Sequence, residues 1–298
     1  MENLQSDHLD TQNLYRDMQK RTGGEIYIGV VGPVRTGKST FIKRFMDVAV
    51  LPYMEDAAQK TRAQDELPQS AGGRTITTTE PKFIPQEAVE LKLAGEVTIR
   101  VRLVDCVGFM VEGAAGHLED GAERLVKTPW YDHEIPFTQA AELGTRKVIT
   151  DHSTIGVVVT TDGSFSDLPQ ETYLDAENQA ISELKKLHKP FLVLVNSSHP
   201  SSRTAREAAE RIEKQHSVTA MPVNCAQLSE EDIRQIMEQI LYEFPVSRVE
   251  FYMPKWVEML PFSHPLKTGL IEKIRELTGK IRTIRDVAEH PPIHWVAT

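Results

Sequence analysis

The sequence has little cysteine, no long apolar run and no excess of basic residues. Its 298 residues include only two cysteines, Cys106 and Cys225, which excludes a disulfide framework or a cysteine-rich zinc site and agrees with a reducing compartment. The longest aliphatic runs, 155–159 and 191–195, are far too short to cross a bilayer, so we do not expect an integral membrane protein. A net charge of −9 argues against nucleic acid as the main partner.

The amino terminus also lacks an apolar segment. Its first residues, MENLQSDHLD, are polar and acidic and do not resemble a secretory signal, so we expect the protein to stay in the cytosol. There is no low-complexity block, internal repeat or Gly/Ser linker. With 40% hydrophobic and 26% charged residues, the chain has the composition of one or two packed globular domains.

Apolar runs of strand length alternate with helix-like stretches, which predicts an α/β fold with a mostly parallel sheet and helices on both faces. Strands are expected at residues 26–31, 97–104, 155–160, 191–195 and 221–223. Helices are expected from about Lys38, around Ile181, Leu184 and Leu187, and from an N-cap at Ser229 to about Phe244.

The pattern changes after Pro245. A short strand is expected at 248–252, followed by one amphipathic helix on which apolar residues recur at steps of three and four. These residues are Leu270, Ile274, Leu277, Ile281 and Ile284. We favour a helix docked on the preceding domain over a partner-binding coiled coil, because the repeat is short and contains Gly279. The tail from His290 shows no periodicity.

A phosphate-binding motif follows the first predicted strand. Residues 32–39, GPVRTGKS, fit GxxxxGK[ST] between a strand and a helix, and the alternative is a chance match on a structural turn. We expect backbone N–H groups to cradle a triphosphate, Lys38 to bind the β and γ phosphates, and Ser39 to bind Mg²⁺. The candidate nucleotide-binding residues here are Gly32, Arg35, Thr36, Gly37, Lys38, Ser39 and Thr40.

A second motif ends the strand at 97–104. Asp105 is followed three residues later by Gly108, the Asp-x-x-Gly pattern of switch-type NTPases. Alone this pattern is weak, because Asp often ends a strand as a turn residue. After a P-loop it predicts that Asp105 holds Mg²⁺ through water and that the Gly108 amide contacts the γ-phosphate. Phe109 stands where Ras-like enzymes use Gln to orient water, so we expect slow hydrolysis through other groups.

Threonines cluster between the two motifs. In residues 75–81, TITTTEP, a threonine can close over Mg²⁺ and the γ-phosphate, which makes the segment a candidate switch loop. Thr78 and Thr79 are the nearest candidates for a catalytic role, and Thr79 also for contact with Mg²⁺. The alternative is the start of a polar strand, because threonine favours strands.

The base-reading motif is incomplete. Guanine-specific members of this class have Asn-Lys-x-Asp after the strand that here is 191–195, whereas this chain has Asn196 followed by Ser197, Ser198 and His199. Because the carboxylate that pairs with guanine is missing, we expect GTP selectivity to be lost and ATP to be the nucleotide, with Asn196 part of its site.

These residues also resemble one family. RTGGEIYIGVVGPVRTGKSTFIKRFM, RAQDELPQS, TTEPKF, RLVDCVG and the block TPWYDHEIPF…AAELGTRKVI…HSTIGVVVTTDG resemble the stage IV sporulation protein A family of endospore-forming bacteria. The resemblance runs from about Arg21 to Asp286, and DELPQS and TPWY are not general features of P-loop proteins. It implies a P-loop fold of the switch-GTPase (TRAFAC-like) class, with Lys38 as the Walker A lysine, Asp105 as the Walker B carboxylate, and Thr78 and Thr79 as paired sensor threonines.

The resemblance also implies a function. Members of that family bind and hydrolyse ATP, polymerise, and form the base layer of the spore coat on the outer forespore membrane, in the mother-cell cytoplasm. Their implied partners are further copies of the chain, other coat proteins and a small amphipathic membrane-bound peptide. The family is longer than this chain, and membrane docking is attributed to its C-terminal end.

The sequence therefore predicts a Mg²⁺-dependent, slow ATPase that acts as a self-assembling scaffold. We expect a polar segment at 1–20, a P-loop ATPase domain at 21–245, and the start of a second, shorter helical region at 246–298. The alternatives are a regulatory GTPase that switches partners, a structural protein that binds ATP without turnover, and a small-molecule kinase. The kinase is disfavoured because the sequence shows no acceptor-binding lid or separate catalytic base.

Overall fold

The computed structural model describes residues 19–20, 22–68, 80–93, 97–114, 118–119, 122–166, 168–246, 249 and 251–289. The chain divides into two units, residues 1–240 and 241–298. The tail from His290 and the threonine segment at 75–79 lie outside the described residues. Among the described helices, none has both the length and the apolar character that a bilayer span requires.

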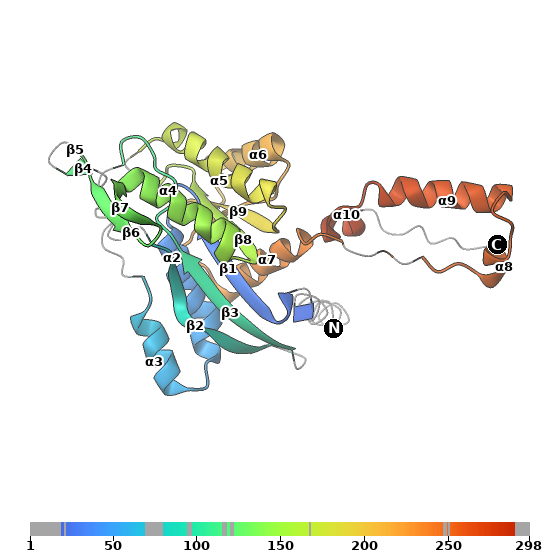
Figure 1. Cartoon of the computed structure of the whole chain (residues 1–298), viewed down its shortest axis with the longest axis horizontal. Helices are drawn as coiled ribbons and strands as arrows, with labels where there is room; N and C mark the ends of the chain where they lie inside the picture. Colours follow the sequence, from blue (N-terminus) through green and yellow to red (C-terminus); the bar gives the residue numbers. More distant parts are fainter. Residues whose placement is uncertain are drawn as a thin grey trace. The chain divides into compact units, whose positions relative to one another are not determined.

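The first unit is built on a six-stranded sheet with the order β10-β9-β8-β1-β3-β2 (Figure 1). All neighbouring strands are parallel except β2, which runs antiparallel to β3. The strands are β1 (Glu25–Val31), β2 (Lys82–Leu93), β3 (Val97–Asp105), β8 (Ile155–Thr161), β9 (Phe191–Asn196) and β10 (Ala220–Val223). The five strands predicted before Pro245 are confirmed, and the edge strand β2 adds to them.

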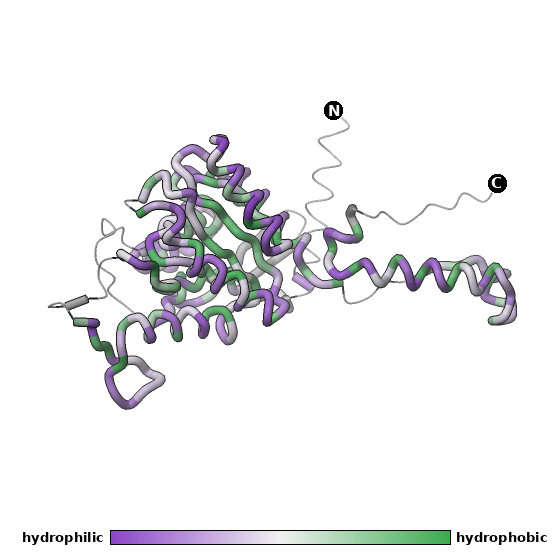
Figure 2. The backbone as a smooth tube through the Cα atoms, turned by 90° about the horizontal axis from the view of Figure 1, so that it is seen from above, coloured by the Kyte–Doolittle hydropathy of each residue, from purple (hydrophilic) through white to green (hydrophobic). Residues whose placement is uncertain are grey.

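Buried residues explain the parallel core. Every residue of β8 and β9 is buried, as continuous aliphatic runs covered on both faces must be. The order of the strands places β1 between β3 and β8, with Val30 beside both Asp105 and Val157. The functional loops that follow β1, β3 and β9 therefore emerge at one edge of the sheet. Figure 2 shows these central strands as the most hydrophobic part of the tube.

Helices of the first unit connect the strands in the α/β pattern that the sequence predicts. They are α2 (Lys38–Phe45), α3 (Ala57–Asp65), α4 (Phe137–Lys147), α5 (Leu174–Lys186) and α6 (Arg203–His216), with shorter turns η1 (Met46–Val50), η2 (Leu51–Tyr53), η3 (Val148–His152) and η4 (Gln170–Tyr173). Apolar residues of η3, α5 and α6 share one core cluster with Val104, Val158 and Val193 of the sheet. Leu187, expected on the helical face of α5, instead lies beyond its last residue and is 41% exposed.

Two hairpins lie between β3 and α4. They consist of β4 (Leu118–Glu119) with β5 (Ala122–Glu123), and β6 (Leu125–Thr128) with β7 (Tyr131–Pro136). Phe137 begins α4 directly after β7, and its amide donates to Arg124 O at 2.8 Å. The β6–β7 hairpin is therefore joined to the first turn of α4.

The helix α7 (Glu230–Tyr242) spans the boundary between the units. Ser229 and Asp232 form the expected N-cap, because the Ser229 amide donates to Asp232 Oδ2 at 2.8 Å and the Asp232 amide donates to Ser229 Oγ at 3.2 Å. The second unit continues with α8 (Lys255–Glu258), α9 (Pro265–Thr278) and α10 (Ile284–Glu289).

Two expectations for the second unit are wrong. The single amphipathic helix is divided in two, because α9 ends at Thr278 before Gly279 and Ile284 begins α10, with Ile281 in the connection. The physical reason is a contact between distant residues: Thr283 pairs with Pro245, and the Ile284 amide donates to Phe244 O at 3.0 Å, which interrupts the helix. The strand expected at 248–252 is also absent from the described residues there, 249 and 251–252, which are irregular.

Candidate functional site

The P-loop occupies the connection from β1 to α2, and its two glycines are required by the backbone. Gly32 has φ +127°, and a Cβ at this position would lie 2.4 Å from Val159 O. Gly37 has φ +95°, and a Cβ there would lie 2.3 Å from Asn196 Nδ2. Both positions combine a left-handed backbone with a contact closer than any side chain tolerates, so only glycine fits.

Thr36 and Asn196 hold the loop against the sheet. The buried Thr36 hydroxyl lies 2.6 Å from Val159 O on β8 and 3.0 Å from Pro33 O. Asn196, the last residue of β9, donates from Nδ2 to Thr36 O at 3.0 Å and accepts the Cys225 amide on Oδ1 at 3.0 Å. The structure thus connects Asn196 to the P-loop and to the loop after β10.

Lys38 begins α2 and is buried, with 5% of its surface exposed. Its Nζ donates to Pro33 O at 2.5 Å, so the ammonium points back into the concave side of the loop. Burial lowers the pKa of the Lys38 ammonium, and the nearby Cys106 and Asp105 partly oppose that shift. An anionic phosphate in the loop would add negative charge beside this buried cation.

Ser39 and Asp105 meet beside Lys38. The Ser39 hydroxyl donates to Asp105 Oδ2 at 2.9 Å, while among the described residues Asp105 Oδ1 is shielded from solvent and has no hydrogen-bond partner. Burial raises the pKa of the Asp105 carboxyl, whereas the bond from Ser39 and the charge of Lys38 lower it. A hydroxyl next to a carboxylate with a spare oxygen is a donor set that fits Mg²⁺.

Gly108 closes the site from the other side. It has φ +100°, and a Cβ there would lie 2.3 Å from Gly32 O and 2.5 Å from Lys38 Nζ. The Gly108 amide donates to the hydroxyl of Thr145 on α4 at 3.1 Å. The next residue, Phe109, exchanges backbone bonds with the P-loop, donating to Gly32 O at 3.0 Å and accepting from the Val34 amide at 2.9 Å.

Other predicted site residues lie around this centre or outside the described part. Arg35 is half-buried and has φ +62°, an uncommon conformation for a side chain other than glycine. Thr40 lies half-buried in the first turn of α2. Phe109 is buried, 1% exposed, so residue 109 belongs to the core and cannot orient water. Thr78 and Thr79 lie outside the described residues.

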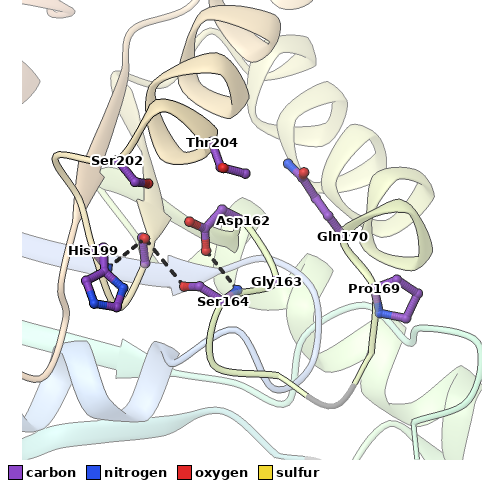
Figure 3. Close-up of a pocket in the computed structure, with 9 residues that line it drawn as sticks. Asp162, Gly163, Ser164, Pro169, Gln170, His199, Ser202 and Thr204 are labelled. Carbon is purple, nitrogen blue, oxygen red and sulfur yellow. Dashed lines mark hydrogen bonds between the residues drawn. The ribbon is translucent and has the colours of Figure 1, made fainter.

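A pocket of about 430 Å³ lies beside the base-reading loop (Figure 3). It is lined by Asp162 and Ser164 after β8, His199 after β9, Gln170 of η4 and Thr204 of α6. Asp162 is 8% exposed, and its Oδ1 accepts the Ser164 amide at 3.0 Å. Sequence reasoning missed this carboxylate, although the Asp162-Gly163 pair directly after a buried strand is a turn signal.

Comparison with known proteins identifies the family. The family model described as stage IV sporulation protein A, ATPase domain, matches residues 9–245, and the one described as its middle domain matches residues 246–292. A curated stage IV sporulation protein A from Clostridioides difficile (strain 630) is 48% identical over 92% of this chain and 56% of its own length. The protein of the same name from Bacillus subtilis (strain 168) is 44% identical over 94% of this chain and 57% of its own length.

The chain thus spans a little over half the length of these relatives. Among solved structures, a complex of SsGBP with GDP gives a TM-score of 0.40 at 12% identity, covering 72% of this chain and 48% of the other. The family match over 9–245 and the identity to curated relatives over most of the sequence agree with the resemblance noted from the motifs. The chain belongs to the stage IV sporulation protein A family.

Proposed function

We propose that this chain binds ATP with Mg²⁺, hydrolyses it slowly, and uses the nucleotide to drive self-assembly into a scaffold at the base of the spore coat. The observation that carries the proposal is the meeting of Lys38, Ser39, Asp105 and Gly108 in one loop cluster at the carboxyl edge of the sheet. The family description as an ATPase domain supports it.

Each residue has a role in this proposal. Lys38 exchanges its contact with Pro33 O for the β and γ phosphate oxygens, where its positive charge stabilises the triphosphate. Backbone amides from Gly32 to Thr40 bind the remaining phosphate oxygens. Ser39 and the free oxygen of Asp105 would hold Mg²⁺, which supplies charge neutralisation at the phosphates when bound.

Water activation is assigned to the threonine segment. Phe109 is buried in the core and cannot take that role. We therefore propose that Thr78 and Thr79 supply the polar contacts to water and the γ-phosphate, with Thr79 also toward Mg²⁺. Two neutral hydroxyls orient water less effectively than a dedicated base, which agrees with slow turnover.

Base choice is proposed to favour adenine. Asn196 holds the P-loop as described, but His199 stands where guanine-specific proteins have a carboxylate. Without that acceptor, the guanine N1–H and amino group are left unpaired, and selectivity for GTP is lost.

The assembly role is proposed from the family. We infer that residues 21–245 form the ATP-hydrolysing domain and that 246–298 begin the second region. Copies of the chain would be its main partner, with other coat proteins and a small amphipathic membrane-bound peptide as further partners. The site of action would be the mother-cell cytoplasm at the outer forespore membrane.

Sedimentation and phosphate release test the proposal together. The purified chain is centrifuged with Mg-ATP, Mg-GTP or no nucleotide, and phosphate release is measured for wild type, Lys38→Ala and Lys43→Ala, an exposed lysine on the same helix. We expect ATP-dependent release that is lost only in Lys38→Ala, with sedimentation that follows ATP.

The other outcomes separate the alternatives. Equal release from wild type and Lys38→Ala would contradict hydrolysis at this site and favour a protein that binds nucleotide without turnover. Clear preference for GTP would contradict the base assignment and favour a regulatory GTPase. Hydrolysis without sedimentation would contradict assembly by this chain.

A further inference from the structure

The Gly108 amide donates to a side chain that no nucleotide-binding motif contains. The amide donates to Thr145 Oγ1 at 3.1 Å. Thr145 is fully buried in α4, and its own hydroxyl proton is directed to Ala141 O at 2.8 Å. The Thr145 oxygen therefore acts as an acceptor toward Gly108, and the contact has a defined direction.

Gly108 itself lies at the phosphate end of the P-loop. Gly108 lies so close to Lys38 that a Cβ on it would come within 2.5 Å of the lysine Nζ. The amide of the glycine in Asp-x-x-Gly is the group proposed above to contact a terminal phosphate. One N–H cannot donate at full strength to two acceptors in different directions, so Thr145 and a phosphate oxygen compete for it.

The competitor is the stronger acceptor. A phosphate oxygen is anionic, and hydrogen bonds to charged acceptors are shorter and roughly twice as strong as those between neutral groups. A terminal phosphate would therefore take the amide from the neutral Thr145 hydroxyl. A diphosphate, which has no group at that position, would leave the Gly108–Thr145 bond in place.

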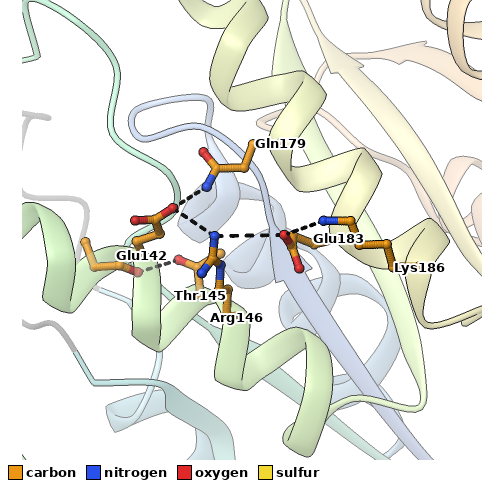
Figure 4. Close-up of polar contacts among 7 residues, drawn as sticks. Glu142, Thr145, Arg146, Gln179, Glu183 and Lys186 are labelled. Atoms are coloured by element: carbon orange, nitrogen blue, oxygen red, sulfur yellow. Dashed lines mark hydrogen bonds and ion pairs between the residues drawn. The ribbon is translucent and has the colours of Figure 1, made fainter.

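Thr145 lies on a helix that is tied to its neighbour. On α4, Glu142 accepts from Gln179 of α5, and Arg146 Nη2 lies 3.2 Å from Glu142 Oε1 and 3.9 Å from Glu183 Oε1 (Figure 4). Figure 4 shows Glu142, Thr145 and Arg146 projecting from the same stretch of α4, with Gln179 and Glu183 reaching toward them from α5. The Gly108–Thr145 bond thus links the site to a helix that also makes polar contacts to α5.

We propose that Thr145 is a positioning residue that holds the Gly108 amide until a terminal phosphate displaces it, so that α4 senses whether a triphosphate or a diphosphate is bound. This inference rests on the proposed nucleotide site and adds to it the residue that distinguishes its two states. The β6–β7 hairpin, joined to the start of α4, would receive the signal.

The test is the ratio of ATP to ADP affinity. Thr145→Val keeps the shape of the side chain but removes the hydroxyl, so the amide loses this acceptor both in the free protein and with ADP, and gains a strong acceptor only with ATP. We expect ADP affinity to stay unchanged and ATP affinity to rise by about five- to thirtyfold, as leaving one buried donor unpaired predicts. Thr145→Ser keeps the hydroxyl and should keep the wild-type ratio.

A second buried hydroxyl supplies the matched control. The Ser153 hydroxyl, next to η3, lies 3.3 Å from Ile149 O, as the Thr145 hydroxyl lies close to Ala141 O, but within the described part of the chain it bonds no residue of the site. Ser153→Ala is expected to leave the affinity ratio unchanged. Calorimetric titration with ATP carrying an imido β–γ bridge, and with ADP, gives the ratio for each variant. An unchanged ratio in folded Thr145→Val overturns the proposal even if that variant is less stable.

Hydrogen exchange on the wild-type chain gives an independent answer that does not depend on the folding of the variant. We expect amides of residues 137–147 to exchange faster with the imido analogue of ATP than with ADP. Equal exchange in the two complexes overturns the proposal. Titration with guanine nucleotides in parallel separates the proposed nucleotide site from the proposed role of Thr145. Preference for GTP would overturn the base assignment only, whereas binding of no nucleotide would overturn both proposals.

Discussion

The Ser39 hydroxyl donates a 2.9 Å hydrogen bond to Asp105 Oδ2, which joins the first turn of α2 to the end of β3. Two residues that lie far apart in the sequence are thereby set as neighbours beside the buried Lys38. Because Asp105 Oδ1 has no partner among the described residues, the pair retains one oxygen for a cation.

Replacing Asp105 by Asn tests that pair. Asparagine keeps an oxygen for Ser39 but loses the negative charge, so we expect Mg²⁺-dependent affinity for ATP to fall by about 10- to 100-fold. Titration of ATP at several Mg²⁺ concentrations measures the effect, with the exposed Asp47→Asn as control. The assignment of Asp105 would be wrong if both variants kept the wild-type dependence on Mg²⁺.

The second prediction concerns Gly37. Alanine here must adopt φ near +95° and brings its Cβ within 2.3 Å of Asn196 Nδ2, so we expect a loss of about 2 kcal/mol in unfolding free energy and loss of nucleotide binding. Gly269→Ala is the control, because Gly269 lies within α9 with nothing near its Cβ. Alanine there should stabilise α9 by up to about 1 kcal/mol. Urea denaturation and ATP titration are measured for both variants. Equal effects of Gly37→Ala and Gly269→Ala would contradict a specific requirement for glycine at residue 37.

The buried Lys38 is predicted to lower the free energy of unfolding. Burial lowers its pKa from the usual 10.5, so the folded protein holds this proton less tightly than the unfolded chain. Above pH 10.5 the Lys38 amine is neutral in both states, and its burial does not reduce the free energy of unfolding. As the pH falls toward the folded-state pKa, the unfolded chain takes up the proton first and the free energy of unfolding decreases. Lys38→Met should therefore be more stable than wild type by about 1–3 kcal/mol at pH 8 and lose ATP binding.

Urea denaturation at pH 8 and near pH 10.5 tests how the stability difference between Lys38→Met and wild type depends on pH. The advantage of Lys38→Met over wild type should shrink as the pH rises, whereas Lys43→Met, on the exposed side of α2, should show no such trend. A Lys38→Met variant less stable than wild type at pH 8 would argue that the ammonium stabilises the loop.

The last prediction concerns a buried carboxylate between α5 and α6. Glu177 is 1% exposed, and it accepts the Thr160 hydroxyl at 2.7 Å and lies 2.8 Å from Arg211 Nη2. Arg211→Met leaves that charge without its counter-ion and should cost about 3 kcal/mol by urea denaturation. The exposed pair of Lys214 with Glu210 is the contrast, since Lys214→Met should change stability by less than about 1 kcal/mol. Similar losses of unfolding free energy in Arg211→Met and Lys214→Met would refute the distinction between the buried and the exposed ion pair.

Much of the fold could be predicted from the sequence because its signals are local. Strands such as 155–161 and 191–196 are aliphatic runs, and the P-loop requires glycine where the backbone must be left-handed. The N-cap at Ser229 is likewise a contact between residues three apart. In each case the neighbouring residues decide the conformation, so a pattern in the sequence is enough.

What could not be predicted depends on contacts between distant residues. Thr145 has no motif, because its role comes from the packing of α4 beside Gly108. Asp162 borders a pocket only because the loops after β8 and β9 meet. The helical repeat that continues to Ile284 is interrupted because the Ile284 amide pairs with Phe244 O, a tertiary contact that overrides the periodicity.

The backbone bonds between Phe109 and the P-loop have a mechanical consequence. Phe109 is bound to Gly32 through its amide and to Val34 through its carbonyl. These two bonds hold the Asp-x-x-Gly segment and the P-loop together. They restrain the Asp-x-x-Gly segment from moving independently of the P-loop. A rearrangement at Gly108 would therefore change its contact with Thr145, so α4 is the element expected to respond to it.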